Sequence, residues 1–217
     1  MTPKAVLFDC DGVIVDSEPI TNILLRDNLA ARGLTLTDAD IVAMFVGGTM
    51  HAVGIKAAQM GANIEDGWLD AMYASMYDRL AQGTPLVQGI EGVLDQLDAA
   101  GILYAVGSNG NERKMQITIG QHPKLWNRLS GHLYSAHVHA KPKPEPDLYL
   151  YAARQLGVDP KDCVVVDDSA AGCRAAKNAG IRCFGYAEHD DGQNLAAENA
   201  IPFHAMSDLP ALLGLPK

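Results

Sequence analysis

Four short apolar segments recur along the chain, and each stops at a small or acidic residue. They span residues 5–8, 102–106, 163–166 and 181–184. Continuous apolar runs of this length are typical of strands that are buried on both faces of a parallel sheet. The pattern therefore predicts four buried parallel strands.

Amphipathic helical patterns separate these strand segments. Residues 90–99, 146–156 and 169–178 place apolar side chains at helical spacing. Gly101 is a stop signal after the first of them, and Ser169 is the expected N-cap of the last. Strands that alternate with helices predict an α/β fold with a doubly wound parallel sheet.

Residues 18–85 interrupt that alternation. They contain three helical stretches and no clear strand pattern, and the Gly47–Gly48 pair is expected to break the helical run. We interpret this segment as a small helical cap domain that is inserted after the first strand. Residues 1–17 and 86–217 are then the core domain.

Composition and charge limit the classes of partner. The chain has 217 residues and a formal net charge of −9. An acidic protein has no general electrostatic attraction for nucleic acids or anionic lipid surfaces, so we expect neither as a partner. Its four cysteines show no disulfide or metal-binding spacing. We find no signal sequence and no apolar run that could span a membrane, and we expect a cytoplasmic location.

Polar side chains gather where the predicted strands end. In open parallel sheets, ligands bind beyond the carboxyl ends of the strands. Three strand ends and one Lys-Pro-rich segment supply the candidate site residues, which are Asp9, Asp11, Ser108, Asn109, Lys143, Asp167 and Asp168. We expect these side chains to meet in a single site.

These residue types suit the hydrolysis of a phosphate monoester. Asp9 is the candidate nucleophile, which would form an aspartyl-phosphate. Asp11 is the candidate general acid and base, first for the leaving alcohol and then for water. A carboxylate that attacks a phosphate dianion needs a divalent cation to offset the repulsion.

The remaining candidates would bind the metal and the phosphate. Mg²⁺ prefers hard oxygen donors, and we assign it to four carboxylates, those of Asp9, Asp11, Asp167 and Asp168. Ser108 and Asn109 stand at an expected helix start, which suits an anion, and Lys143 supplies a fixed cation. Ser108 is also expected to cap the helix that begins at Glu112.

Four motifs, in order, resemble those of the haloacid dehalogenase superfamily. They are FDCDGV at residues 8–13 with DS at 16–17, SN at 108–109, KPEPD at 143–147, and VDDS at 166–169 with Gly172 and the AG pair at 179–180. Lys143 fits the third motif better than Lys141, which we expect to be solvated. The resemblance spans nearly the whole chain. It implies a Rossmann-like core with a helical cap, closest to the β-phosphoglucomutase and sugar-phosphatase-like members.

The resemblance also bears on the reaction. The dehalogenase branch has no Asp at the position of Asp11, because it has no leaving alcohol to protonate. The phosphomutase branch places an arginine in the cap for a distal phosphate, and residues 45–51 contain none, although Lys56 or Arg79 could substitute. A non-catalytic phosphate-binding protein on this fold would be expected to lose Asp9 or Asp11.

We therefore favour a phosphatase whose partner is a small phosphorylated metabolite, such as a sugar or polyol phosphate. The sequence leaves the particular ester and the oligomeric state open. Cys10 is expected to be an inert buried thiol. The histidines at positions 132, 137 and 139 are expected to be strand-edge residues rather than metal ligands, since no further ligand completes a tetrahedral set.

Overall fold

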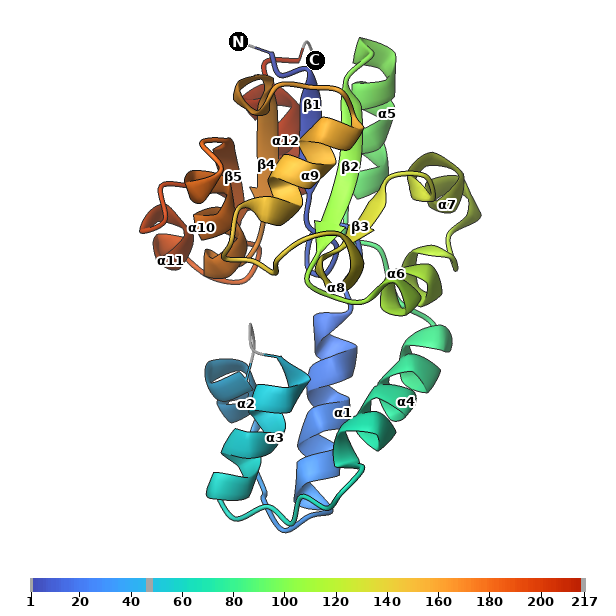
Figure 1. The fold of residues 1–217 in the computed structure, drawn as a ribbon, viewed down its shortest axis with the longest axis vertical. Helices are drawn as coiled ribbons and strands as arrows, with labels where there is room; N and C mark the ends of the chain where they lie inside the picture. Colours follow the sequence, from blue (N-terminus) through green and yellow to red (C-terminus); the bar gives the residue numbers. More distant parts are fainter. Residues whose placement is uncertain (1, 46–48, 216–217) are drawn as a thin grey trace. The chain divides into compact units, whose positions relative to one another are not determined.

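The chain divides into two compact units, which we describe separately (Figure 1). The computed structural model describes residues 2–45 and 49–215. The core unit comprises Met1–Asp16 and Pro85–Lys217, and the helical unit comprises Ser17–Thr84.

Six parallel strands form one sheet in the core unit, in the order β3-β2-β1-β4-β5-β6. The strands are β1 (Ala5–Phe8), β2 (Leu103–Ser108), β3 (Leu133–Ser135), β4 (Cys163–Asp167), β5 (Arg182–Tyr186) and β6 (Ile201–Phe203). In this doubly wound order the chain changes direction between β1 and β4, and in sheets of this kind ligands bind outside that point. The predicted fold class is confirmed.

Four of the six strands lie where the apolar pattern predicted them, and no end is shifted by more than two residues. The edge strands β3 and β6 were not predicted. Each has only three residues, and β6 begins with the exposed Ile201 followed by Pro202. Edge strands this short are buried on at most part of their length, so they leave no continuous apolar run to detect.

Helices connect the strands of the core unit. They are α5 (Ile90–Ala100), α6 (Glu112–Ile119), α7 (Pro123–Leu129), α8 (Ala136–His139), α9 (Asp147–Gln155), α10 (Ala170–Asn178), α11 (Gln193–Ala196) and α12 (Leu209–Leu212), with short 3₁₀ turns η1 (Pro160–Asp162) and η2 (Met206–Asp208). The predicted helix ends are present. Gly101 adopts a φ of 67° after α5, and the Gly172 N–H donates to Ser169 Oγ at 3.0 Å at the start of α10.

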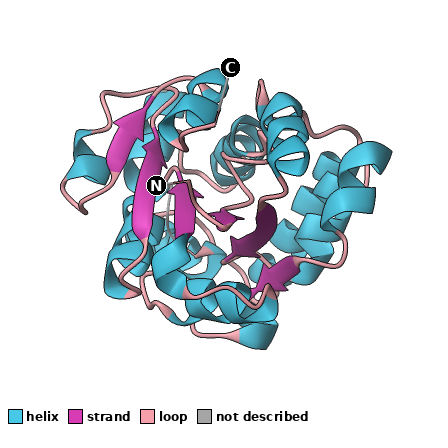
Figure 2. Cartoon of the chain, turned by 90° about the horizontal axis from the view of Figure 1, so that it is seen from above, coloured by secondary structure: helices cyan, strands magenta, loops and turns pink. Residues whose placement is uncertain are grey.

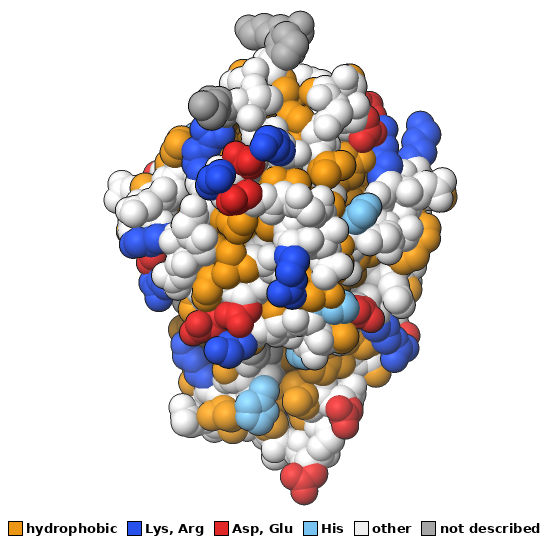
Figure 3. Space-filling view, turned by 45° about the horizontal axis from the view of Figure 1, so that its top comes forward, with side chains coloured by type: hydrophobic (Ala, Val, Ile, Leu, Met, Phe, Trp, Pro, Cys, Tyr) orange, Lys and Arg blue, Asp and Glu red, His pale blue; other side chains and the backbone are white. Residues whose placement is uncertain are grey.

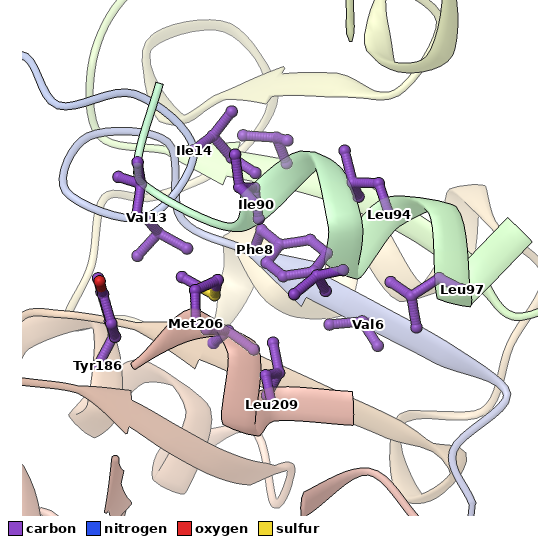
Figure 4. Packing of buried hydrophobic residues seen from close by; sticks show 14 of the residues in the cluster. Val6, Phe8, Val13, Ile14, Ile90, Leu94, Leu97, Tyr186, Met206 and Leu209 are labelled. Carbon is purple, nitrogen blue, oxygen red and sulfur yellow. The ribbon is translucent and has the colours of Figure 1, made fainter. Parts of the chain in front are cut away.

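Helices cover both faces of this sheet (Figure 2). Successive residues of a strand point to opposite faces, so Leu7 and Phe8 enter different layers. On the first face, Phe8 packs in one cluster with Leu97 of α5 and Leu209 of α12 (Figure 4). On the second face, Leu7 joins a cluster that contains Tyr149 of α9 and residues of α10 and α11.

The helical unit contains the three predicted helices and a fourth. Its helices are α1 (Glu18–Ala30), α2 (Asp38–Phe45), α3 (Met50–Gln59) and α4 (Trp68–Ala81). Leu29, Trp68 and Met72 lie in its buried cluster, and Trp68 Nε1 donates to Asn28 Oδ1 at 2.8 Å. The unpredicted helix is α3, which Thr49 caps. The expected break at Gly47–Gly48, and part of the arginine-free stretch 45–51, lie outside the described residues.

Charges of both signs are mixed on one face of the molecule (Figure 3). On the face that Figure 3 shows, Lys and Arg side chains lie next to Asp and Glu side chains. Among the described residues, no single helix is long and apolar enough to cross a membrane, and α2 with α3 meets that test only as a pair bent by 115°. Ile41 of α2 and Val53 of α3 are buried in the helical unit itself.

Leu97 tests how much the first layer of the core contributes to stability. Its side chain is fully buried beneath the sheet, so Leu97→Ala should lower the free energy of unfolding by about 2–5 kcal/mol. Leu150→Ala is the matched control, because Leu150 on α9 is 37% exposed and its loss should change stability by less than about 0.5 kcal/mol. Urea unfolding measures both, and equal effects would contradict this account of the core.

Candidate active site

The carboxyl ends of β1 and β4 bring two acidic residues together. The strands pair in parallel, with Phe8 beside Val166. The backbone N–H of Asp9 donates to the carbonyl oxygen of Val166 at 2.9 Å. Asp9 therefore leaves β1 at the level where β4 ends in Asp167, and this is the switch point of the sheet.

Lys143 joins these two carboxylates. Its Nζ is ion-paired with Asp9 Oδ1 and lies 2.8 Å from Asp167 Oδ2. Only 3% of the lysine side chain is exposed. Burial lowers the pKa of Lys143, but the Asp167 and Asp9 carboxylates outweigh it and the net pKa is raised, so the ammonium group stays charged. Lys141, the other candidate, is exposed.

Asn109 holds the loop that carries Lys143. The Lys143 N–H donates to Asn109 Oδ1 at 2.8 Å, and Asn109 Nδ2 donates to the Lys143 carbonyl oxygen at 3.2 Å. Asn178 Nδ2 of α10 donates to the Pro144 carbonyl oxygen at 3.1 Å. The Asn109 side chain, expected to bind phosphate, thus pairs with the backbone of the lysine loop.

Asp167 is fully buried and surrounded by donors. The Ser169 N–H and Oγ donate to its Oδ1 at 2.9 and 2.7 Å, and Tyr149 OH donates to its Oδ2 beside Lys143. Burial raises the pKa of Asp167, but Lys143 and these hydrogen bonds outweigh it, and the net pKa is lowered. Asp167 is therefore an ionised anchor for the lysine.

For Asp9 the influences that raise the pKa are stronger than those that lower it, which is the opposite of Asp167. Burial is the largest influence and raises its pKa, and the Asp167 and Asp11 carboxylates add to this effect. Together they outweigh the attraction of Lys143, and the net pKa is about 7. Lys143 alone therefore does not hold the pKa of Asp9 at its usual value. Additional positive charge next to Asp9 would lower its pKa and favour the nucleophilic form.

Asp11 is paired with a lysine that the sequence reasoning missed. Lys114 Nζ lies 2.7 Å from Asp11 Oδ1, and the two side chains are only 16% and 22% exposed. Burial lowers the pKa of Lys114, but Asp11 outweighs it and the net pKa is raised. Lys114 stands in the first turn of α6, and side chains there lean toward the helix N-terminus. Its position six residues after Ser108, at the start of the helix that follows β2, was the sequence signal that could have placed it near the site.

Ser108 lies at the end of β2 and is buried. Its Oγ accepts a hydrogen bond from the Gly110 N–H at 2.9 Å. The expectation that Ser108 caps α6 is wrong, because the Lys114 N–H donates to Asn111 Oδ1 at 2.9 Å and Asn111 is the N-cap. Since Ser108 is three positions before the cap of α6, its hydroxyl faces the turn that connects strand and helix.

Ion pairs with lysines engage three of the four predicted metal ligands, Asp9, Asp11 and Asp167. Within residues 2–45 and 49–215, no three or more acidic, histidine or cysteine side chains form a group that could hold a metal ion. The carboxylates of Asp167 and Asp11 bind the ammonium groups of Lys143 and Lys114 instead.

Asp168 lies over the loop that follows β1. A Cβ atom at Gly12 would stand 2.0 Å from Asp168 Oδ2, and Gly12 has a φ of 76°. Only glycine suits this position, both for its backbone conformation and for the approach of the carboxylate. Asp9 and Asp168 therefore offer hard oxygen donors from two adjacent strands, and this donor chemistry fits a divalent cation.

The structure shows the surroundings of His139 and Cys10, neither of which was expected to take part in the chemistry. His139 Nε2 lies 3.1 Å from Glu112 Oε1, and the His139 ring stacks on Tyr151, so this histidine belongs to an aromatic cluster beside α9. Cys10 is buried in the first layer of the core, and burial raises its thiol pKa well above the usual range. Its sulfur is poorly suited to act as a nucleophile.

Comparison with known proteins identifies the class of enzyme. The model of the haloacid dehalogenase-like hydrolase family matches residues 3–180. The chain therefore belongs to this family, as its four motifs predicted.

Relatives match along nearly the full chain. The 6-phosphogluconate phosphatase of Escherichia coli (strain K12) is 29% identical over 210 residues, which are 96% of this chain and 94% of that protein. A CBBY-like protein of Arabidopsis thaliana is 31% identical and covers 90% of this chain and 68% of its own length. The crystal structure of a hydrolase of this family from Deinococcus radiodurans R1, with bound phosphate and sodium, has a TM-score of 0.84 at 31% identity and covers 98% of this chain and 96% of that one.

Gly172 tests the packing around Asp167. A Cβ atom at Gly172 would lie 1.7 Å from Asp167 Oδ2, so Gly172→Ala must displace the carboxylate that holds Lys143. We expect this substitution to lower the free energy of unfolding by about 1–3 kcal/mol. Gly92→Ala is the matched control, since Gly92 is also the third residue of its helix and has open space around it. There alanine should stabilise by about 0.5–1 kcal/mol. Stabilisation by both substitutions would contradict the described packing.

Proposed function

We propose that this protein is a Mg²⁺-dependent phosphatase, which hydrolyses a small sugar or polyol phosphate through a phospho-enzyme on Asp9. The observation that carries the proposal is the buried ammonium group of Lys143, which is held against Asp9 at the switch point of the sheet. The activity for which the E. coli relative is named and the phosphate in the Deinococcus structure support the same substrate class.

The first half of the reaction forms the phospho-enzyme. A carboxylate oxygen of Asp9 attacks phosphorus, and the bond between phosphorus and the ester oxygen breaks as the new one forms. Lys143 neutralises charge on the phosphoryl oxygens and orients Asp9. Asp11, in its protonated form, gives a proton to the departing alkoxide, so that a neutral alcohol leaves.

The second half restores Asp9. Asp11, now ionised, takes a proton from a water molecule, and the hydroxide oxygen attacks phosphorus. The bond between phosphorus and the Asp9 oxygen breaks, which releases inorganic phosphate and the free carboxylate. Lys114 stays within hydrogen-bond distance of Asp11 and positions it for both proton transfers.

Asp9 and Asp168 are the residues that we expect to hold the magnesium ion. When bound, the ion would offset the repulsion between the Asp9 carboxylate and the phosphate dianion. Asp11 and Asp167, also predicted ligands, would contribute only by giving up part of their ion pairs with Lys114 and Lys143.

We further propose that residues 1–17 and 86–217 act as the catalytic domain, and that residues 18–85 act as a cap that governs the choice of substrate. All four cysteines are free and buried, which suits a reducing compartment such as the cytoplasm.

Asp9→Asn tests the nucleophile. The amide cannot form the phospho-enzyme, so turnover should fall at least about 1,000-fold while cooperative unfolding is retained. Phosphorus NMR of the protein with a panel of phosphorylated metabolites is the measurement. Free phosphate reports hydrolysis, whereas a relocated ester signal would report a phosphomutase. Asp95→Asn, at an exposed core-unit carboxylate, should retain full activity. Wild-type activity in Asp9→Asn would remove the proposed mechanism.

Removal of divalent cations tests the metal. Treatment with EDTA should abolish hydrolysis, and added Mg²⁺ should restore it, because the site carries too little positive charge to accept a phosphate dianion unaided. Titration of the EDTA-treated protein with Mg²⁺ by calorimetry should show binding that Asp168→Asn weakens. Activity that is indifferent to EDTA would show that the reaction needs no dissociable cation.

A further inference from the structure

Tyr149 contacts both Lys143 and Asp167, which are ion-paired with each other. It is the third residue of α9 and is fully buried. Its hydroxyl donates a hydrogen bond to Asp167 Oδ2, and the Lys143 ammonium nitrogen lies 4.8 Å from the centre of its ring. A tyrosine in this place was not among the residues that the motifs suggested.

We propose that Tyr149 is a positioning residue that balances Lys143 between Asp9 and Asp167. The inference rests on the proposed function, in which Lys143 must stay in contact with the nucleophile. Tyr149 acts on the lysine directly through the face of its ring and indirectly through the carboxylate that attracts it.

The arrangement of donors around Asp167 carries the argument. The two donors of Ser169 bind Oδ1, whereas Tyr149 and Lys143 share Oδ2. A hydroxyl that donates to Oδ2 offsets part of its charge, and this weakens its pull on the ammonium group. Without that hydroxyl, Oδ2 would draw Lys143 toward Asp167 and away from Asp9.

The ring supplies the second contact. A cation over an aromatic face is attracted by the electron-rich centre of the ring, and the attraction grows when water is excluded. The Lys143 side chain is 3% exposed, so this contact is desolvated. The ring therefore adds a third attraction that holds the ammonium group in place beside the two carboxylates.

The position of Tyr149 is set by the core. A Cβ atom at Gly107 of β2 would come within 3.6 Å of Tyr149 Cε1, so the ring packs directly on the strand. From this fixed ring the hydroxyl donates to Asp167 Oδ2. Tyr149 is thus a rigid support.

Tyr149→Phe is the decisive variant, because it removes the hydroxyl and keeps the ring. We expect kcat to fall about tenfold, since hydrogen bonds to charged groups contribute effects of this order, and KM to change less than about twofold. Tyr151→Phe is the control from the same helix. Tyr151 packs against Tyr134 and His139 instead, and its variant should keep both constants. An unchanged kcat in Tyr149→Phe, or an equal loss in Tyr151→Phe, would overturn the proposal.

A second measurement does not depend on catalysis. Urea unfolding midpoints of Tyr149→Phe, Lys143→Met and the double variant form a double-mutant cycle. If the two residues act on one another, the midpoint change caused by Tyr149→Phe will depend on whether the protein also carries the Lys143→Met substitution. Equal changes would show that the residues are independent and would overturn the proposal. If the wild-type protein hydrolyses no phosphate monoester, the proposed function fails, and this cycle still decides whether Tyr149 positions Lys143.

Discussion

A single buried ammonium group between two carboxylates is the constraint around which the core unit is organised. Taking three charged groups out of water costs several kcal/mol per ion, and only close pairing with further hydrogen bonds offsets that cost. Asp9, Lys143 and Asp167 come from three separate segments, so the register of β1 with β4 and the path of the lysine loop must both be correct. Asn109 secures that loop through its backbone.

The same charges support the proposal that the site binds a further cation. Four carboxylates, those of Asp9, Asp11, Asp167 and Asp168, outnumber the two ammonium groups of Lys114 and Lys143. Burial and the neighbouring Asp167 and Asp11 carboxylates outweigh Lys143 and hold the net pKa of Asp9 at about 7. A bound phosphate dianion would raise that pKa further. The approach of Asp168 over Gly12 and the oxygen donors of both aspartates support the proposed divalent cation.

The sequence predicted the parts of this arrangement that depend on local pattern. Buried strands and the polar residues at their ends follow from apolar runs and their interruption, so β1, β2, β4 and β5 were found. Which side chains form ion pairs and hydrogen bonds with one another depends on tertiary structure, and it was not predictable from local pattern. Lys114 looks like a solvated helix cation, and Tyr149 looks like one more apolar position of α9, until the fold places them beside Asp11 and Asp167. For the same reason, no local pattern shows that four donors surround Asp167.

In the proposed mechanism Asp167 holds Lys143 in place and Asp9 reacts with the phosphate. This division indicates which residues can select among substrates. Lys143 and Asp9 would touch only the phosphoryl group, which every phosphate monoester shares, so they set the reaction without discriminating among alcohols. Tyr149 and Asp167 are buried and have no access to a substrate. Selection among esters must therefore come from side chains outside this network. A substitution that changes substrate preference can then leave the Lys143 ion pairs intact, whereas one that disturbs those pairs should slow every substrate alike.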